Sequence, residues 1–183
     1  MEKIHLEKQG ETLTFLTPDD QTADKLEMYL EIAPGKSGPT PHIHCLSDEG
    51  FEVKSGTLIV LIDGKESILR SGDKIIVKAG QVHSFRNGSD EEAALVNGYI
   101  DPAYNFKWML VEMAKSANER GGSWDNVSLI LAGYVLFLLR KEYRLGGIPF
   151  FIQDILFGIL SLTAKLTGKW KTLPQRPVLT YKN

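Results

Sequence analysis

Glycine recurs every eight residues in the middle of the chain, at Gly56, Gly64, Gly72, Gly80 and Gly88. The segments between these glycines are rich in strand formers, as in residues 57–62 and 74–77. Glycine tolerates the positive φ that tight turns need, and Asp63-Gly64 is a strong hairpin signal. Because the segments are not similar to one another, the spacing predicts a jelly-roll β-barrel and not a repeat.

The composition of the chain changes near Asp101-Pro102, and this change predicts two parts. Before it, short apolar runs alternate with turn residues; after it, the apolar runs are longer. We expect a mainly β fold, with a barrel domain over residues 1–101 and a helical C-terminal extension over residues 102–183. Beyond the segments between the glycines, strands are predicted at residues 11–16, 25–32, 51–54, 82–86 and 93–100.

The composition of the chain is typical of an ordinary folded protein and gives no sign of a nucleic-acid-binding or secreted one. A hydrophobic fraction of 43% and a charged fraction of 24% are those of an ordinary folded protein. A net charge of -2 gives no reason to expect nucleic acid as a partner, because phosphate binding needs a basic surface. The first residues are charged and unlike a signal peptide, and the single cysteine, Cys45, cannot form an internal disulfide. We therefore expect a cytoplasmic protein.

Three of the four histidines and one glutamate form a candidate metal site. His42 and His44 are two residues apart, so on a strand both side chains point to the same face. Glu49 follows after room for a turn, and His83 begins another predicted strand. Imidazoles with one carboxylate suit one divalent transition metal, Fe, Mn, Ni, Cu, Co or Zn, whose identity the sequence does not specify. The alternative is a barrel that keeps these residues without a metal.

Three other residues could be mistaken for ligands. Glu52 is an odd number of residues from Glu49, so on one strand the two side chains point to opposite faces. Cys45 follows His44 and is expected to face away from the metal as a buried thiol. His5 lies in a polar segment and is expected to be solvated.

The residues around the candidate ligands resemble the two motifs of the cupin superfamily. The first motif is matched by Gly35, Pro41-His42-Ile43-His44, Glu49 and Gly56, and the second by Gly72, Gly80, His83 and Asn87. Two positions depart from the pattern: Lys78 replaces the usual proline, and Gly35 lies one place early. The departures are in turns, so we expect changed loop geometry and a retained site.

This resemblance implies a function as well as a fold. Similar metal-dependent cupins suggest oxidoreductase chemistry, with a quercetinase-like dioxygenase of an enolic or phenolic small molecule as the leading interpretation. Glu49 would then be both a metal ligand and the catalytic base. A metal-assisted isomerase or lyase, and a non-catalytic module that binds or senses a small ligand, are the alternatives, because a fold alone does not define a function.

The second part of the chain predicts about three helices. They are expected over residues 104–119, from Ser123 or Asp125 to about Arg144, and over residues 150–166. Gly146-Gly147 would end the second helix, and Pro149 would begin the third. The second helix is apolar nearly all round and therefore needs burial on most sides.

The helices can be buried in three ways: against the barrel or a dimer partner, at a membrane surface, or across a membrane. The apolar runs, residues 127–139 and 148–162, are shorter than the about 18–20 residues that a crossing needs. Lys165, Lys169 and Lys171 suit an anionic membrane surface, although a solvated helix end explains them equally. We favour packing on the barrel or a homodimer over a membrane surface.

Overall fold

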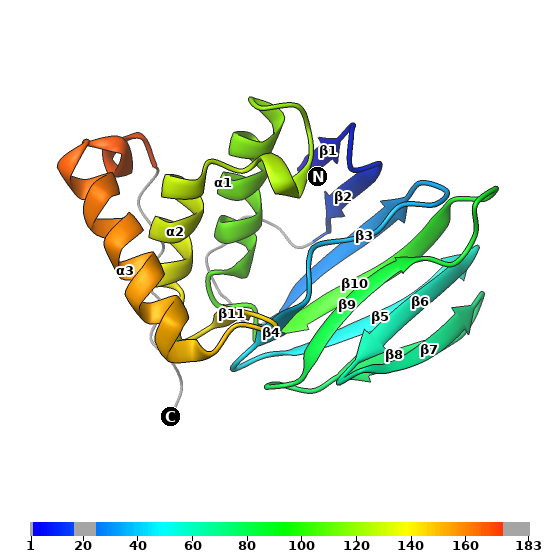
Figure 1. Ribbon diagram of the computed structural model, residues 1–183. Coiled ribbons are helices and arrows are strands. Elements are labelled where there is room, and N and C mark those ends of the chain that lie inside the picture. Colours follow the sequence, from blue (N-terminus) through cyan, green and yellow to red (C-terminus); the bar gives the residue numbers. More distant parts are fainter. Residues whose placement is uncertain (1, 17–24, 174–183) are drawn as a thin grey trace.

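Two antiparallel sheets and three helices make up the fold in a computed structural model that describes residues 2–16 and 25–173 (Figure 1). The strands are β1 (Lys3–Leu6), β2 (Glu11–Phe15), β3 (Leu26–Ile32), β4 (His42–His44), β5 (Asp48–Ser55), β6 (Thr57–Ile62), β7 (Lys65–Arg70), β8 (Lys74–Val77), β9 (Val82–Asn87), β10 (Ala94–Asp101) and β11 (Tyr143–Leu145). The helices are α1 (Phe106–Asn118), α2 (Leu129–Leu138) and α3 (Phe150–Leu166), with 3-10 turns η1 (Trp124–Asn126) and η2 (Lys169–Thr172).

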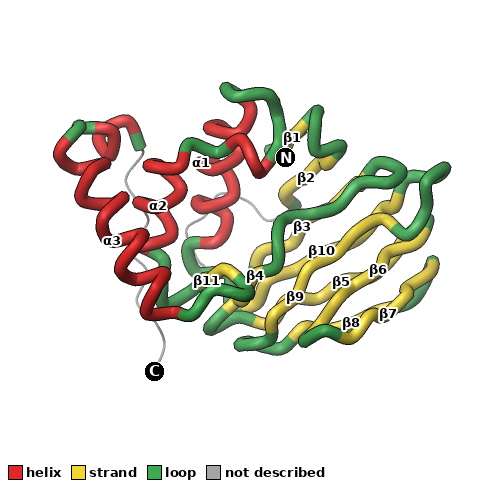
Figure 2. Tube along the Cα trace, viewed as in Figure 1, coloured by secondary structure: helices red, strands yellow, loops and turns green. Residues whose placement is uncertain are grey.

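The two sheets enclose one core. One sheet has the order β1-β2-β3-β10-β5-β8, and the other has the order β11-β4-β9-β6-β7. Buried residues alternate with exposed ones along β3 and with half-buried ones along β2, as expected where one sheet face meets the core. Leu58, Val60, Val53 and Val96 are among the fully buried residues between the sheets. The predicted mainly β barrel followed by three helices is confirmed (Figure 2).

The predicted hairpin at Asp63-Gly64 joins β6 to β7. Both residues have positive φ, 49° and 81°, which is the combination that a two-residue type I′ turn requires. β1 was not predicted, although the alternation of buried Ile4 and Leu6 with exposed neighbours gives a short strand signal.

The second predicted helix is shorter than expected, and part of it is a strand. α2 ends at Leu138 and not near Arg144, and the following residues form β11, which pairs with β4. The amide of Cys45 at the end of β4 donates to the carbonyl of Glu142. The strand forms here because it pairs with an edge of β4 that would otherwise be unpaired. β4 is about 100 residues away in the sequence, so no local pattern indicates this pairing. The predicted boundary between the two parts, at residues 101 and 102, stays a prediction. Met1 and Asn183, the outer limits of the two parts, lie outside the described residues.

The helices occupy one side of the barrel. Leu110, Ala114 and Ala117 of α1 belong to the same core cluster as the barrel residues. α2 and α3 lie side by side (Figure 1), and Gly133 of α2 allows this approach because a Cβ there would collide with Leu160. Among the described residues, no helix combines the length and apolar character needed to cross a bilayer.

A buried carboxyl lies where η1 meets the barrel. Glu11 is 1% exposed, and its Oε2 accepts a hydrogen bond of 2.6 Å from Trp124 Nε1. Burial raises the pKa of Glu11 to about 7; the Trp124 hydrogen bond opposes this shift and the charge of Glu49 adds to it. The carboxyl is therefore neutral in the folded protein at mildly acidic pH.

We expect Asn87→Ala to lower the free energy of unfolding by about 2–3 kcal/mol, because this buried side chain makes four hydrogen bonds. Its Nδ2 donates to the carbonyls of Ile32, Ala33 and Glu92, and its Oδ1 accepts from the Ser89 amide. Urea unfolding measures the change, with exposed Glu91→Ala as the control. Equal stabilities of the two variants would contradict this role for Asn87.

We expect the stability advantage of Glu11→Gln over the wild type to grow as pH rises from about 4.5 to 7. Over this range the carboxyl is ionised in the unfolded chain but still protonated in the folded one. The free energy of unfolding of the wild type therefore falls by up to about 3 kcal/mol, and that of the variant does not. Urea unfolding at a series of pH values, with chelator present, measures the difference. Parallel profiles for the two proteins would show that Glu11 ionises normally.

Candidate metal centre

The antiparallel pairing of β4 with β9 brings together two of the predicted ligands. His42 and His83 are direct partners in this pairing, and their ring centroids lie 4.2 Å apart. His44 is on the same face of β4, as the two-residue spacing predicted. Glu49 comes from β5 in the other sheet and reaches across the barrel interior to His83, with an Oε2–Nε2 distance of 2.6 Å.

All four predicted ligands are buried and close together. One donor atom from each of His42, His44, Glu49 and His83 lies within 4.8 Å of the others. His44 Nε2 is 3.4 Å from Glu49 Oε2 and makes no hydrogen bond within the described part of the chain. A buried nitrogen without a hydrogen-bond partner destabilises the fold unless a bound group satisfies it. Three imidazole nitrogens and a carboxylate fit a divalent transition metal, and this cluster could hold one.

Backbone carbonyls orient two of the imidazoles. His42 Nδ1 lies 2.9 Å from the carbonyl of Thr40, and His83 Nδ1 lies 3.1 Å from that of Gln81. Since a carbonyl only accepts, each Nδ1 carries a proton; His42 Nε2 is then left with a lone pair for the site, whereas His83 Nε2 is hydrogen-bonded to Glu49 Oε2. This is the usual arrangement behind metal-binding histidines.

The electrostatics of the cluster keep His42 neutral and Glu49 ionised, whereas the hydrogen bond and charge of Glu49 raise the pKa of His83 against the effect of its burial. Burial, together with the charges of His83 and His44, lowers the pKa of His42 to about 3, so this imidazole is neutral. Burial alone would raise the pKa of Glu49, but the charges of His44 and His83 and the hydrogen bond with His83 outweigh it and hold the pKa below its ordinary value. An ionised carboxylate and neutral imidazoles are the forms that bind a cation.

Aromatic residues from the second part of the chain cover the cluster. The Tyr143 ring of β11 stacks on His42, with centroids 5.1 Å apart and planes at 19°. Phe106, the first residue of α1, meets the His44 ring edge-on at 4.8 Å. Neither residue was predicted, because no local pattern shows that residues 60 to 100 positions away return to the site. Burial raises the pKa of Tyr143, and the charge of Glu49 adds to this shift, so the phenol stays protonated.

A small cavity adjoins His44. It has room for about one water molecule, with a volume of about 10 Å³. Two of its polar side chains are bonded within the protein: Ser47 donates to the Pro102 carbonyl, and Glu142 accepts from the amide and side chain of Asn105. The rest of the wall is largely apolar and consists of Ala103, Phe106, Met109, Leu139 and the ring of Tyr143.

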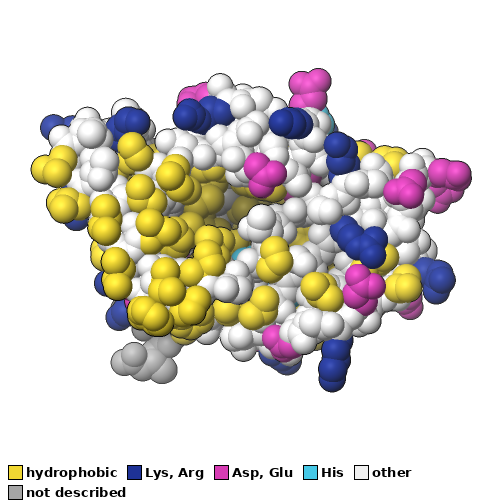
Figure 3. Space-filling view, in the orientation of Figure 1, with side chains coloured by type: hydrophobic (Ala, Val, Ile, Leu, Met, Phe, Trp, Pro, Cys, Tyr) yellow, Lys and Arg dark blue, Asp and Glu magenta, His cyan; other side chains and the backbone are white. Residues whose placement is uncertain are grey.

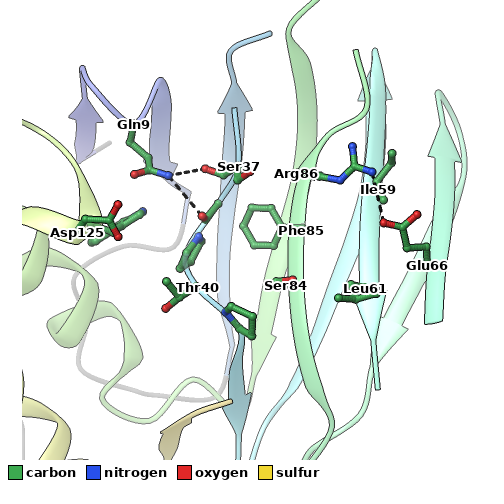
Figure 4. A pocket seen from close by; sticks show the side chains of 14 residues that line it. Gln9, Ser37, Thr40, Ile59, Leu61, Glu66, Ser84, Phe85, Arg86 and Asp125 are labelled. Carbon is green, nitrogen blue, oxygen red and sulfur yellow. Dashed lines mark hydrogen bonds and ion pairs between the residues drawn. The ribbon is translucent and has the colours of Figure 1, made fainter. Parts of the chain in front are cut away.

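A larger pocket, of about 400 Å³, lies away from the cluster. It is bordered by the loop before β4, by β9 and by η1, and Figure 4 shows Ser37, Thr40, Phe85 and Asp125 around it. None of the four candidate ligands lines it. The buried cluster, where the donor atoms converge, is therefore the candidate site. Phe85 borders this other pocket.

The residues set aside as ligands lie outside the cluster. Glu52 pairs with Lys54 and Lys74 at the surface. His5 is exposed and bonds to Thr12. Cys45 is half-buried, and burial raises the pKa of its thiol despite the nearby charge of Arg144. Glu52 and His5 lie where they were expected, whereas Cys45 is less buried than expected.

Residues 28–99 match the family model described as Cupin_2, a cupin domain. This part of the chain is a cupin domain. The match includes all four candidate ligands and runs from β3 to β10. The motif resemblance seen in the sequence is thereby confirmed.

Two curated relatives of the cupin domain come from Streptomyces. The chain is 33% identical over 88 residues to the tetracenomycin polyketide synthase protein TcmJ of Streptomyces glaucescens, covering 48% of this chain and 58% of the relative. It is 34% identical over 87 residues to the polyketide synthase CurC of Streptomyces cyaneus, covering 48% and 56%. The chain thus spans little more than half the length of these relatives.

The structure of KdgF from Halomonas sp. is one of the solved structures to which the chain is similar. It shares 22% identity and a TM-score of 0.48, covering 56% of this chain and 88% of that one.

We expect the purified protein to contain near-stoichiometric transition metal, and the double variant His42→Ala/His83→Ala to lose at least about tenfold of it. Elemental analysis after gel filtration measures both. His5→Ala is the matched control, because His5 is an exposed histidine outside the cluster. Wild-type protein that stays metal-free after reconstitution with each candidate ion would contradict the metal site.

Proposed function

We propose that this cupin protein is a metal-dependent dioxygenase of a small, largely apolar substrate with an enol or phenol group. The observation that carries the proposal is the buried set of four donors facing an apolar wall. A divalent metal held by His42, His44, Glu49 and His83 would supply a Lewis-acidic centre with positions left for a substrate oxygen. The same residues are the proposed ligands, and Glu49 is the proposed base.

The roles of the protein groups follow from their contacts. Glu49 Oε2 lies 2.6 Å from His83 Nε2, so the carboxylate is already placed at the centre of the cluster to accept a substrate proton. Phe106 and Tyr143 would exclude water and pack against the flat face of an aromatic or enolic substrate. Because the cavity at His44 is small, substrate entry requires these two rings to move.

The surroundings of the site support an apolar substrate. Serine and glutamate groups in the cavity wall are bonded within the protein, which leaves few polar groups for a sugar-like ligand. The molecule is hollowed between the helices and the barrel, and hydrophobic side chains border this hollow (Figure 3). The names of the two Streptomyces relatives point the same way, because polyketides carry enolisable carbonyl groups.

We expect the metal-loaded protein to consume oxygen with a flavonol, a catechol or a β-diketone, and Glu49→Gln to lower this rate by about 10²–10⁴-fold because it removes the base. An oxygen electrode measures the rate, with metal content determined for each protein. Glu52→Gln is the matched control, since it removes a carboxylate from the outer face of the same strand.

Other outcomes would replace the proposal with one of its alternatives. Conversion of substrate without oxygen uptake would indicate a metal-assisted isomerase or lyase. Tight binding without turnover would indicate a ligand-binding or sensing module. Either result contradicts the dioxygenase assignment and leaves the metal site intact.

A further inference from the structure

The faces of α3 are reversed relative to an ordinary surface helix. Its buried face carries two polar side chains, Gln153 and Ser161, together with Ala164 and Phe157. Its exposed face is apolar: Ile159 is 60% exposed and Leu166 is 80% exposed. A surface helix normally places its apolar stripe toward the core. The exposed face of α3 is therefore matched to an apolar surrounding and not to water.

The exposed apolar residues form one continuous stripe, here called the α3 face. They are separated by three or four positions, so they lie along one side of the helix: Phe151, Ile155, Ile159, Leu162 and Leu166, flanked by Ile148, Ile152 and Leu156. Figure 3 shows the gathering of hydrophobic side chains over this part of the molecule. Eight such side chains about half exposed present on the order of 1,000 Å², above the few hundred Å² of an ordinary monomer patch.

Polar contacts behind the helix hold this face outward. The Gln153 side chain accepts from the Leu145 amide and donates to the carbonyls of Leu145 and Ile148. Arg144 of β11 pairs with Asp154 at 2.7 Å. Turning the α3 face inward would break these hydrogen bonds and the ion pair. The contacts of the inner side of α3 therefore keep its apolar face exposed.

The charges around the α3 face are basic. Lys165, Lys169 and Lys171 are exposed at its C-terminal end beside half-exposed Trp170, and the sole carboxylate of α3, Asp154, is paired. The sequence shows the same bias on a larger scale. Residues 102–183 contain 11 basic and 5 acidic residues, a net charge of +6, whereas residues 1–101 contain 10 basic and 18 acidic residues, a net charge of −8.

This charge separation decides between the two partners that could cover the face. A second copy docked through α3 would bring two positively charged helical parts together, which electrostatic complementarity disfavours. An anionic bilayer offers both an apolar layer for the stripe and negative headgroups for the lysines, with tryptophan at the boundary. We propose that the α3 face docks on the surface of a bilayer containing anionic phospholipid.

The geometry fits a helix that lies along the surface. α3 has 17 residues and is therefore about 25 Å long, and its inner face is bonded to the rest of the protein. The stripe can enter the headgroup and upper acyl region while the barrel stays in water. This inference does not depend on the proposed metal chemistry.

Sedimentation with vesicles tests the inference. The full-length protein is mixed with vesicles of phosphatidylcholine alone or of phosphatidylcholine with phosphatidylglycerol, at low and high salt. We expect binding to the anionic vesicles, reduced by salt because the screening length shortens. The triple variant Ile155→Ser/Ile159→Ser/Leu162→Ser should lower the partition coefficient by about a hundredfold. Charge reversal at Lys165, Lys169 and Lys171 to Glu should lower it by at least about tenfold.

Matched controls change the barrel in the same way. Ile68→Ser/Ile76→Ser removes exposed apolar residues from β7 and β8, and reversal of Lys65, Arg70 and Lys74 to Glu changes the same charge. We expect both to bind like the wild type. The inference is overturned if the wild type binds neither vesicle, or if the controls weaken binding as much as the α3 variants. It is also overturned if light scattering finds a lipid-independent dimer that the Ile155 triple variant dissociates.

Discussion

The pairing of β4 with β9 is the constraint on which the candidate site depends. It sets His42 directly opposite His83, and the strand alternation then places His44 on the same side. Glu49 must come from the other sheet, so the four donors converge only when the two sheets are closed over a common core. The site is therefore a product of the closed barrel, and its geometry is as rigid as the packing between the sheets.

The burial of these polar residues is offset by hydrogen bonds at their far sides. The carbonyls of Thr40 and Gln81 accept hydrogen bonds from the Nδ1 atoms of His42 and His83. Within the cluster, His83 Nε2 is hydrogen-bonded to Glu49 Oε2. The Nε2 of His44 is left without a hydrogen bond among the described residues. This unsatisfied nitrogen lies at the point where the four donors meet. A protein interior accepts such an atom when a ligand completes it.

Local patterns predicted the barrel well, and they singled out the four residues that the structure brings together. The glycine spacing, the Asp63-Gly64 turn and the pair His42 and His44 all act through neighbouring residues, so their signals are present in short windows of sequence. β11 and the aromatic cover were not predicted, because Tyr143 is a strand residue only through the open edge of β4. The reversed faces of α3 were also missed, since composition alone does not say which side of an apolar helix is buried.

The position of β11 has a consequence for the integrity of the molecule. This short strand covers the edge of the strand that carries His42 and His44, and Gln153 bonds it to α3. A barrel cut at Asp101 would present β4 as an open edge with unpaired amides and carbonyls, and unpaired edges recruit strands from other molecules. β11 thus covers a sheet edge that would otherwise be free to pair with a strand of another molecule.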